Sequence, residues 1–330
     1  MTWRLLDPEP QTAAWHVACD TALLEARAGG LSPDTLRFFS CDPPSLLLGA
    51  HQFESGPDGC RRITGGPSVV LDSNTVGWTL TLSRKSGIDE MRRRVAAAAA
   101  EALRPFGYPA DPGPRGLRLS RRVVCPIVET SEGAALLIQG FLFVAGTRPP
   151  AISLFEAAGG SAPSTDEVRQ ALARSFAERF EVSLEKGALT TEERALLAAK
   201  IPEMRAADWV RSVRPPEGET FRGIAEGDGV AVCATVLPGE RRNALRRVVF
   251  SGDFCAHPRS AIRDLQKELG DTAVDEAPAR IQGFFLRAGA EVPGLSPGDF
   301  FTALSLAYMK RRITLSTAAD PAAWKRELPT

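Results

Sequence analysis

Lysine is scarce in this chain, and neither sign of charge is in excess. Only six of the 40 Lys and Arg residues are lysines, and these 40 cations are balanced by 40 Asp and Glu residues, so the formal net charge is zero. A chain with this balance creates no long-range field that attracts nucleic acid or an anionic lipid surface. We therefore expect no nucleic acid and no membrane among its partners.

Long apolar runs and paired cysteines are also missing. The longest run of small apolar residues, Val95 to Ala100, is far too short to span a bilayer, and the first residues lack the apolar core of a signal peptide. Six cysteines are scattered without a Cys-x-x-Cys pair, which argues against a disulfide framework. Cys255 and His257 have no second ligand pair near them, so no metal site is predicted. We expect a cytoplasmic protein with reduced thiols.

What the sequence does contain is a clear succession of helical and strand-like segments. Apolar spacing predicts helices over residues 12–28 and 87–106, and strands over 35–41, 45–51, 68–71, 77–83, 122–128, 135–145 and 151–155. Three prolines predict an irregular segment over 108–119. Ser164 with Glu167, and Thr190 with Glu193, have the spacing of capping boxes, so each pair predicts the start of a helix.

The composition of Pro215-Pro216-Glu217-Gly218 is typical of a linker, and a second group of elements follows it. Strands are expected over 221–236 and 246–250, and helices over 258–269, 273–288 and 297–312. Strands precede helices within each half, which favours the α+β class over a doubly wound sheet. We expect residues 1–215 to form a mainly antiparallel sheet packed by helices, and residues 216–330 a small α+β domain.

One loop has the composition of a ligand-binding loop. Residues 61–66 read Arg-Arg-Ile-Thr-Gly-Gly. Two adjacent glycines leave backbone N–H groups open to a carbonyl or phosphate, and an arginine offers a fork-shaped cation for an anion. The alternative is a plain turn that carries solvated arginines.

Other segments support the ligand-binding interpretation of this loop. Residues 16–24 read His-Val-Ala-Cys-Asp-Thr-Ala-Leu-Leu, and two apolar segments flank Asp42-Pro43-Pro44. Together with Arg-Arg-Ile-Thr-Gly-Gly, they resemble the lipoate–protein ligase and octanoyltransferase superfamily, whose motifs include N-M-A-x-D-E-A-L-L and R-R-x-T-G-G. Residues 189–209 look like the end of the family's catalytic domain, and residues 251–254 resemble the start of a helix-bearing part of the ligase accessory domain. The resemblance implies a class II synthetase-like catalytic domain over 1–215 and an accessory domain over 216–330.

The resemblance also implies which residues bind the acyl ligand. Carried over motif by motif, they are Arg61, Arg62, Thr64, Gly65, Gly66, Asp72, Trp78, Leu137 and Gly140. Two of these positions depart from the family pattern. The histidine before Asp72 is replaced by Leu71, and Leu137 occupies the place of the lysine that holds the adenylate in relatives. No lysine lies between Lys85 and Lys186, so no shift of alignment restores it. The loss of such an electrostatic contact costs several kcal/mol in a transition state.

Cys125 is a candidate nucleophile. It lies twelve residues before Leu137, close to the spacing in the cysteine-dependent octanoyltransferases of this superfamily. A thiolate there would take an acyl group as a thioester and pass it on without ATP. The alternative is that Cys125 is a small buried hydrophobic residue in the strand, which is the usual place of a free cysteine.

Three functions remain open at this point. The first is transfer of an octanoyl or lipoyl group to a lysine of a lipoyl-domain or H-protein-like carrier, with Cys125 as nucleophile and with acyl carrier protein as one source of the acyl group. The second is the ligase reaction, which alone requires ATP and Mg²⁺, with Arg121 or Arg122 in place of the lysine. The third is a non-catalytic pseudoenzyme that binds a carrier or an acyl ligand. Fold resemblance alone does not choose among them.

Overall fold

The computed structural model describes residues 1–7, 9–53, 59–84, 87–146, 151–240 and 243–319. Backbone contacts divide the chain into two compact units. Unit 1 comprises Met1–Ser212 with Cys255–Arg259, and unit 2 comprises Val213–Phe254 with Ser260–Thr330. The short segment Cys255–Arg259 is thus grouped with unit 1, although the residues on both sides of it belong to unit 2.

Unit 1 is built on an eight-stranded sheet. The strands lie in the order β11-β1-β2-β6-β10-β9-β8-β7. Their bounds are β1 Thr2–Leu6, β2 Thr35–Phe39, β6 Thr75–Ser83, β7 Asp111–Gly113, β8 Gly116–Leu119, β9 Arg122–Glu132, β10 Ala135–Phe143 and β11 Ser183–Lys186. From β2 to β7 neighbouring strands are antiparallel, whereas β1 is parallel to both of its neighbours. The expected α+β class with a mainly antiparallel sheet is confirmed.

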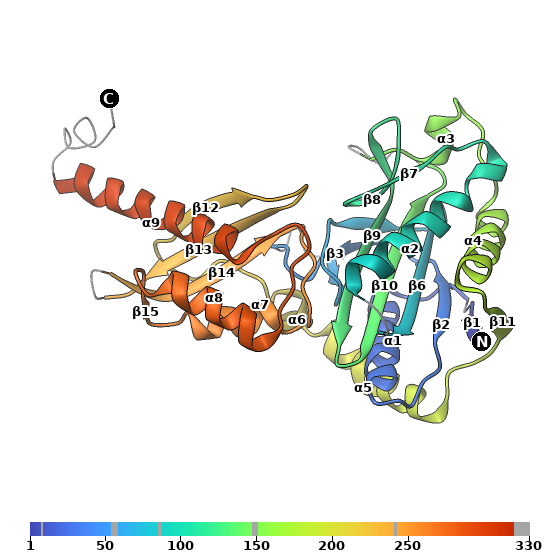
Figure 1. Cartoon of the computed structure of the whole chain (residues 1–330), viewed down its shortest axis with the longest axis horizontal. Helices are drawn as coiled ribbons and strands as arrows, with labels where there is room; N and C mark the ends of the chain where they lie inside the picture. The colour runs from blue at the N-terminus through green and yellow to red at the C-terminus, as the bar shows by residue number, and fades with distance from the viewer. Residues whose placement is uncertain (8, 54–58, 85–86, 147–150, 241–242, 320–330) are drawn as a thin grey trace. The chain divides into compact units, whose positions relative to one another are not determined.

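Helices cover the two faces of this sheet (Figure 1). Helix α1 (Ala13–Ala28) packs with α5 (Thr191–Arg205) on one face, and α2 (Ile88–Glu101) packs with α4 (Thr165–Phe180) on the other. Each face has its own apolar core. The α1 face contains Leu23, Leu137 and Phe141, and the α2 face contains Trp78, Val95 and Ile138. Because side chains alternate along a strand, neighbouring residues of β6 and β10 contribute to different cores.

A second, three-stranded sheet lies beside the α1 core. Its order is β4-β3-β5, with β3 Ser45–Leu48, β4 Gly59–Arg61 and β5 Val69–Leu71. The Arg61–Gly66 segment connects β4 to β5. Val69 and Leu71 point into the α1 core, together with Ile63 of the connection. The small sheet therefore holds this loop against the α1 face of the main sheet.

Two segments of unit 1 differ from the sequence-based expectation. The strand predicted over 151–155 is wrong, because Ser153 caps the short helix α3 (Leu154–Ala157) through a capping box with Glu156. The irregular segment predicted over 108–119 contains β7 and β8, preceded by the 3₁₀ helix η1 (Arg104–Phe106). Gly116 permits this pairing, since a Cβ on it would lie 2.1 Å from the Cys125 carbonyl oxygen and its φ is +116°.

Unit 2 is a four-stranded sheet with helices. Its order is β12-β13-β14-β15, with β12 Phe221–Glu226, β13 Ala231–Pro238, β14 Ala244–Gly252 and β15 Thr272–Ala273. The helices are α7 (Ala261–Glu268), α8 (Ala277–Ala288) and α9 (Pro297–Ala319). Helix α9 crosses β12 closely at Gly223, where a Cβ would meet the Ala303 carbonyl oxygen at 2.1 Å.

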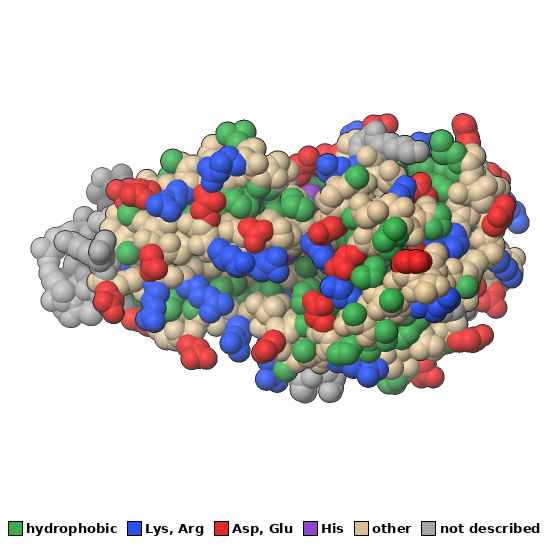
Figure 2. Space-filling model, turned by 90° about the horizontal axis from the view of Figure 1, so that it is seen from below, with side chains coloured by type: hydrophobic (Ala, Val, Ile, Leu, Met, Phe, Trp, Pro, Cys, Tyr) green, Lys and Arg blue, Asp and Glu red, His purple; other side chains and the backbone are tan. Residues whose placement is uncertain are grey.

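The surface shows no field of one charge on the face in view. Figure 2 shows basic and acidic side chains distributed together over this face, as the balance of 40 cations and 40 anions leads one to expect. Among the helices that the structure describes, none is both long enough and apolar enough to cross a bilayer.

Candidate acyl-transfer site

The Arg61–Gly66 loop is fixed by its own arginines. The Arg62 guanidinium is buried and donates hydrogen bonds to the carbonyl oxygens of Leu47, Gly65 and Pro67 at 2.8–3.0 Å, and its Nε contacts Thr64 Oγ1 at 3.2 Å. It also lies over the Phe141 ring at 5.0 Å. Many hydrogen bonds from one rigid cation to the backbone hold the loop in a single conformation.

Arg61 fixes the start of the loop in the same way. Its Nη1 donates to the carbonyl oxygens of Gly49 and Gln52 at 2.9 and 2.7 Å, and its Nε donates to Val210 at 2.9 Å. Val210 ends the short helix α6 (Ala207–Val210), whose Trp209 donates its indole N–H back to the Arg61 carbonyl at 2.9 Å. The arginine pair thus organises the backbone around the loop.

Close packing also restricts the glycine at the end of the loop. Gly66 has a φ of +81°, and a Cβ on it would lie 2.2 Å from Val128 of β9. A left-handed backbone and this close approach both require glycine. The loop therefore contacts the α1 face of the main sheet directly.

A buried polar network connects the loop to helix α1. Thr64 Oγ1 donates to Gln139 Oε1 at 2.8 Å, and Gln139 Nε2 donates to Asp20 Oδ2 at 2.6 Å. Asp20 Oδ1 accepts from Arg37 at 2.5 Å, with side-chain exposures of 3% and 1%. The four residues come from the loop, β10, α1 and β2, so one chain of hydrogen bonds spans the α1 core.

Arg37 continues this network to His16. Burial, reinforced by the Arg37 charge, lowers the pKa of His16 to about 3, so the imidazole is neutral near pH 7. Its Nε2 lies 2.8 Å from the Ser40 carbonyl oxygen, which only accepts, and its Nδ1 lies 2.9 Å from Arg37 Nη1. The tautomer with Nε2–H satisfies both contacts. Burial alone would lower the pKa of Arg37, but the Asp20 charge raises it, and the arginine stays protonated.

Leu137 lies on the same face of the sheet as this network, at the position where the family pattern noted above has a lysine. It is fully buried and belongs to the α1 core with Ile63, Val128 and Phe141. The basic residues of the Arg61–Gly66 loop bind backbone carbonyls, and Leu137 brings no charge. Leu137 therefore adds an apolar side chain to the α1 core beside the charged Asp20–Arg37 pair and the arginines of the loop, whose guanidinium groups already donate hydrogen bonds.

Three residues of the expected site lie on the opposite face of the sheet. Gly140 approaches Trp78 so closely that a Cβ would lie 2.1 Å from the indole ring, and Trp78 shares the α2 core with Cys125. The structure thus brings together Arg61, Arg62, Thr64, Gly65, Gly66 and Leu137 on one face, and separates Trp78, Gly140 and Cys125 from them. Asp72 lies in the turn after β5, where it accepts hydrogen bonds from Asn74 N and Thr75 Oγ1 at 3.0 and 2.9 Å.

The described thiols are neutral in this structure wherever they are enclosed. Burial raises the thiol pKa to about 12 for Cys19, Cys41 and Cys125 and to about 11 for Cys60. It raises the pKa of Cys255 as well. Cys125 is 1% exposed. A neutral, enclosed thiol is a poor nucleophile, because the thiolate is the reactive form. Within the described residues, no group of three His, Cys, Asp or Glu side chains is arranged to hold a metal ion.

Sequence reasoning missed Asp20, Arg37, Gln139 and His16 as members of this network. Two signals were present. Asp20 is a charged residue within the apolar helical run Ala-Cys-Asp-Thr-Ala-Leu-Leu, and Arg37 lies within the apolar strand Thr-Leu-Arg-Phe-Phe. A charge inside an apolar segment of either kind predicts a buried partner.

The fold defines the class of the protein: an α+β unit built on an eight-stranded sheet, with an additional small α+β unit. Residues 12–146 match the lipoyl protein ligase A/B catalytic domain family. An octanoyltransferase LipM from Kyrpidia tusciae is 27% identical over 270 residues, which cover 63% of this chain and 98% of the relative. This part of the chain therefore belongs to the lipoate–protein ligase and octanoyltransferase superfamily.

Two further comparisons agree with this assignment. Octanoyltransferase LipM from Moorella thermoacetica is 32% identical over 125 residues, but this match spans only 46% of the relative and 33% of this chain. A solved structure of a bipartite lipoate protein ligase and its E2 lipoyl domain from Thermoplasma acidophilum superimposes with a TM-score of 0.57 at 19% identity, covering 66% of this chain and 99% of that chain. At that identity the superposition shows the fold alone.

Proposed function

We propose that the protein transfers an octanoyl or lipoyl group to a lysine of a lipoyl-domain carrier protein. The observation that carries this proposal is the match to an octanoyltransferase over 98% of that relative's length. The fold shared with a lipoate ligase that was solved with its lipoyl domain supports the choice of acceptor. In the reaction an amide bond forms between the lysine Nζ and the acyl carbonyl carbon, and the bond from that carbon to its donor breaks.

We further propose that the donor is an acyl thioester rather than free acid with ATP. Formation of an acyl adenylate develops negative charge that a cation must stabilise. Leu137 supplies none, and Arg62 already donates to three backbone carbonyls. Transfer from the thioester of acyl carrier protein releases a thiol and needs neither ATP nor Mg²⁺, which would be required only for a ligase reaction.

The proposal is tested by incubating the full chain with a lipoyl domain and either octanoyl-acyl carrier protein or octanoate with ATP and Mg²⁺. We expect the intact mass of the lipoyl domain to rise by one octanoyl group with the first donor and not with the second. A lipoyl domain whose acceptor lysine is replaced by methionine is the control. Modification only with ATP would contradict the thioester donor, and no modification with either would contradict the transfer itself.

Cys125→Ala tests whether the acyl group passes through this thiol. Because Cys125 is enclosed with a raised pKa on the face opposite the Arg61–Gly66 loop, we expect the variant to transfer at the parent's rate. We also expect thiol reagents to label Cys125 slowly in the folded protein, and Cys233, which is partly exposed, faster. Loss of transfer by a variant with unchanged circular dichroism would instead assign the nucleophile to Cys125.

A further inference from the structure

A cavity of about 340 Å³ lies in unit 1, away from the Arg61–Gly66 loop. It is formed where the end of β1, helix α1, strand β2 and the β11–α5 connection meet. The lining residues are Leu6, Asp7, Trp15, Cys19, Arg37, Gly187, Ala188, Leu189 and Arg194. None of them belongs to the loop. This volume is at the lower end of the range for small-molecule sites.

The cavity walls are mainly apolar. Leu6 is buried, and Trp15 and Leu189 are partly buried against the α1 core. Cys19 is 1% exposed, and burial raises its pKa to about 12, so its thiol is neutral. Ala188 adds a methyl group at the rim. An aliphatic chain that binds here moves from water into contact with apolar side chains, and this transfer is favourable in proportion to the apolar area buried.

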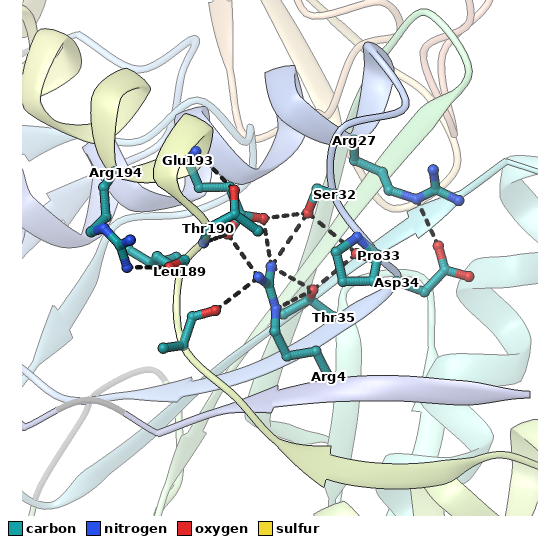
Figure 3. A network of polar contacts seen from close by, with 11 residues as sticks. Arg4, Arg27, Ser32, Pro33, Asp34, Thr35, Leu189, Thr190, Glu193 and Arg194 are labelled. Carbon is teal, nitrogen blue, oxygen red and sulfur yellow. Dashed lines mark hydrogen bonds and ion pairs between the residues drawn. The ribbon is translucent and has the colours of Figure 1, made fainter.

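Arg194 provides a positive charge at the rim. Its Nη1 donates to the Leu189 carbonyl oxygen at 2.5 Å (Figure 3). Its Nη2 contacts Thr191 Oγ1 at 3.4 Å. These contacts hold the guanidinium next to Leu189 at the start of α5. The Glu192 carboxylate interacts electrostatically with Arg194, but among the described residues no carboxylate lies within ion-pair distance of its guanidinium. Because the Arg194 side chain is exposed, it can also contact an anionic group of a ligand.

The other charges around the cavity are already balanced. Asp7 lies 3.4 Å from Arg169, and Arg37 is paired with Asp20 at 2.5 Å. Arg37 Nε has no hydrogen-bond partner in the part of the chain that the structure describes. The exposed Arg194 is therefore the cation at the rim that a ligand can reach.

We propose that this cavity binds a monocarboxylate with a short aliphatic body, whose chain lies against Leu6, Trp15 and Leu189 and whose carboxylate contacts Arg194. The apolar walls select the chain and the exposed guanidinium of Arg194 selects the anionic end. The site is separate from the acyl-transfer chemistry proposed above and does not depend on it.

The test uses the full chain with octanoate as the probe, measured by calorimetry. We expect saturable binding with a dissociation constant on the order of a millimolar or tighter, and binding of octanol weaker by about fivefold or more, because it lacks the charge that Arg194 pairs with. Arg194→Gln should weaken octanoate binding to the same degree. Arg174→Gln, on the exposed side of α4, is the matched control and should leave it unchanged.

A second measurement locates the bound chain. An octanoate brominated at its terminal carbon should quench tryptophan emission, and Trp15→Phe should remove most of that quenching without changing the affinity by more than a few fold. Ala188→Phe should fill the cavity and abolish binding while the thermal unfolding curve stays the same. Absence of saturable binding, or binding that survives both Arg194→Gln and Ala188→Phe, would overturn the proposal. Neither result would bear on transfer to a lipoyl domain.

Discussion

Glu193→Gln is expected to unfold unit 1 at a clearly lower urea concentration than the parent protein. The Glu193 side chain is fully buried and receives both terminal nitrogens of Arg4 at 2.6 and 2.7 Å, with the Ser32 hydroxyl as a third donor (Figure 3). Glutamine leaves the Arg4 charge without a counter-charge and turns an amide NH₂ toward these donors. Breaking a buried pair in this way costs about 3 to 5 kcal/mol.

The matched control is Glu192→Gln, one residue earlier on the exposed side of α5. It should leave the urea midpoint of unfolding nearly unchanged, as is usual for a surface substitution. The double variant Arg4→Met with Glu193→Leu removes both charges and should be more stable than Glu193→Gln alone. Equal unfolding midpoints for Glu193→Gln and Glu192→Gln would contradict a stabilising role of the pair.

The Arg4–Glu193 pair also makes the stability of the fold depend on pH. Burial pushes the pKa of Glu193 upward, but hydrogen bonds from Arg4 and Ser32 outweigh it, and the pKa lies below its ordinary value. A carboxylate with a depressed folded-state pKa stabilises the fold above its unfolded-state pKa of about 4.3, and this stabilisation disappears as the pH falls through the folded-state value. The stability difference between the parent and Glu193→Gln should therefore shrink in acid.

Local signals in the sequence predicted local structure well. Ser164 with Glu167, and Thr190 with Glu193, form the capping boxes that their spacing indicates, and α4 and α5 begin at the next residue. Ser153 with Glu156 carries the same signal. The strand predicted there is wrong because this capping box, which needs only two residues three apart, starts a helix within the apolar run.

Such local signals do not predict the pairing of strands that are far apart in the sequence. Strands β1 and β11 were not predicted, since each is short and lies at the parallel edge of the main sheet, where Thr2 pairs with Ser183. The link from Glu193 to Arg4 has the same character. Thr190, three residues earlier, indicates the cap. Nothing near Glu193 in the sequence indicates that its carboxylate also pairs with the Arg4 guanidinium of β1.

The candidate site shows where strand alternation should have constrained the prediction. Leu137 and Gly140 are three residues apart in β10, so they must point to opposite faces of the sheet. Leu137 lies with the Arg61–Gly66 loop, and Gly140 lies against Trp78. What alternation cannot supply is the register of β9 against β10, which places Ile127 opposite Gly140 and encloses Cys125 in the α2 core.

The polar network gives the loop a connection to the core that the family resemblance does not describe. Thr64 is held by Gln139, Gln139 by Asp20, and Asp20 by Arg37. Gln139 is the only amide of this chain of contacts, and its two ends are fixed because Asp20 accepts and Thr64 donates. The orientation of the loop therefore depends on the charge of Asp20, although Asp20 does not contact the loop.

Asp20→Asn is accordingly expected to impair both stability and transfer. The substitution leaves Arg37 buried without a counter-charge, at a cost of about 3 to 5 kcal/mol. The new amide can also offer an NH₂ group to Gln139, which would favour reversal of the Gln139 amide and loss of the bond from Thr64. We expect a lower urea midpoint and, at a temperature where the variant is still folded by circular dichroism, slower octanoyl transfer to a lipoyl domain.

Arg27→Gln provides the control for Asp20→Asn, because it breaks an ion pair of helix α1 that is partly exposed. Arg27 Nε lies 2.8 Å from Asp34, with side-chain exposures of 20% and 19%, and such a pair contributes about 1 kcal/mol or less. We expect a small loss of stability and unchanged transfer. If Asp20→Asn lowered stability but transferred at the parent's rate, the network would only support the fold. If it did neither, the Asp20 charge would not control the loop, and Arg62 with its backbone contacts would suffice to hold it.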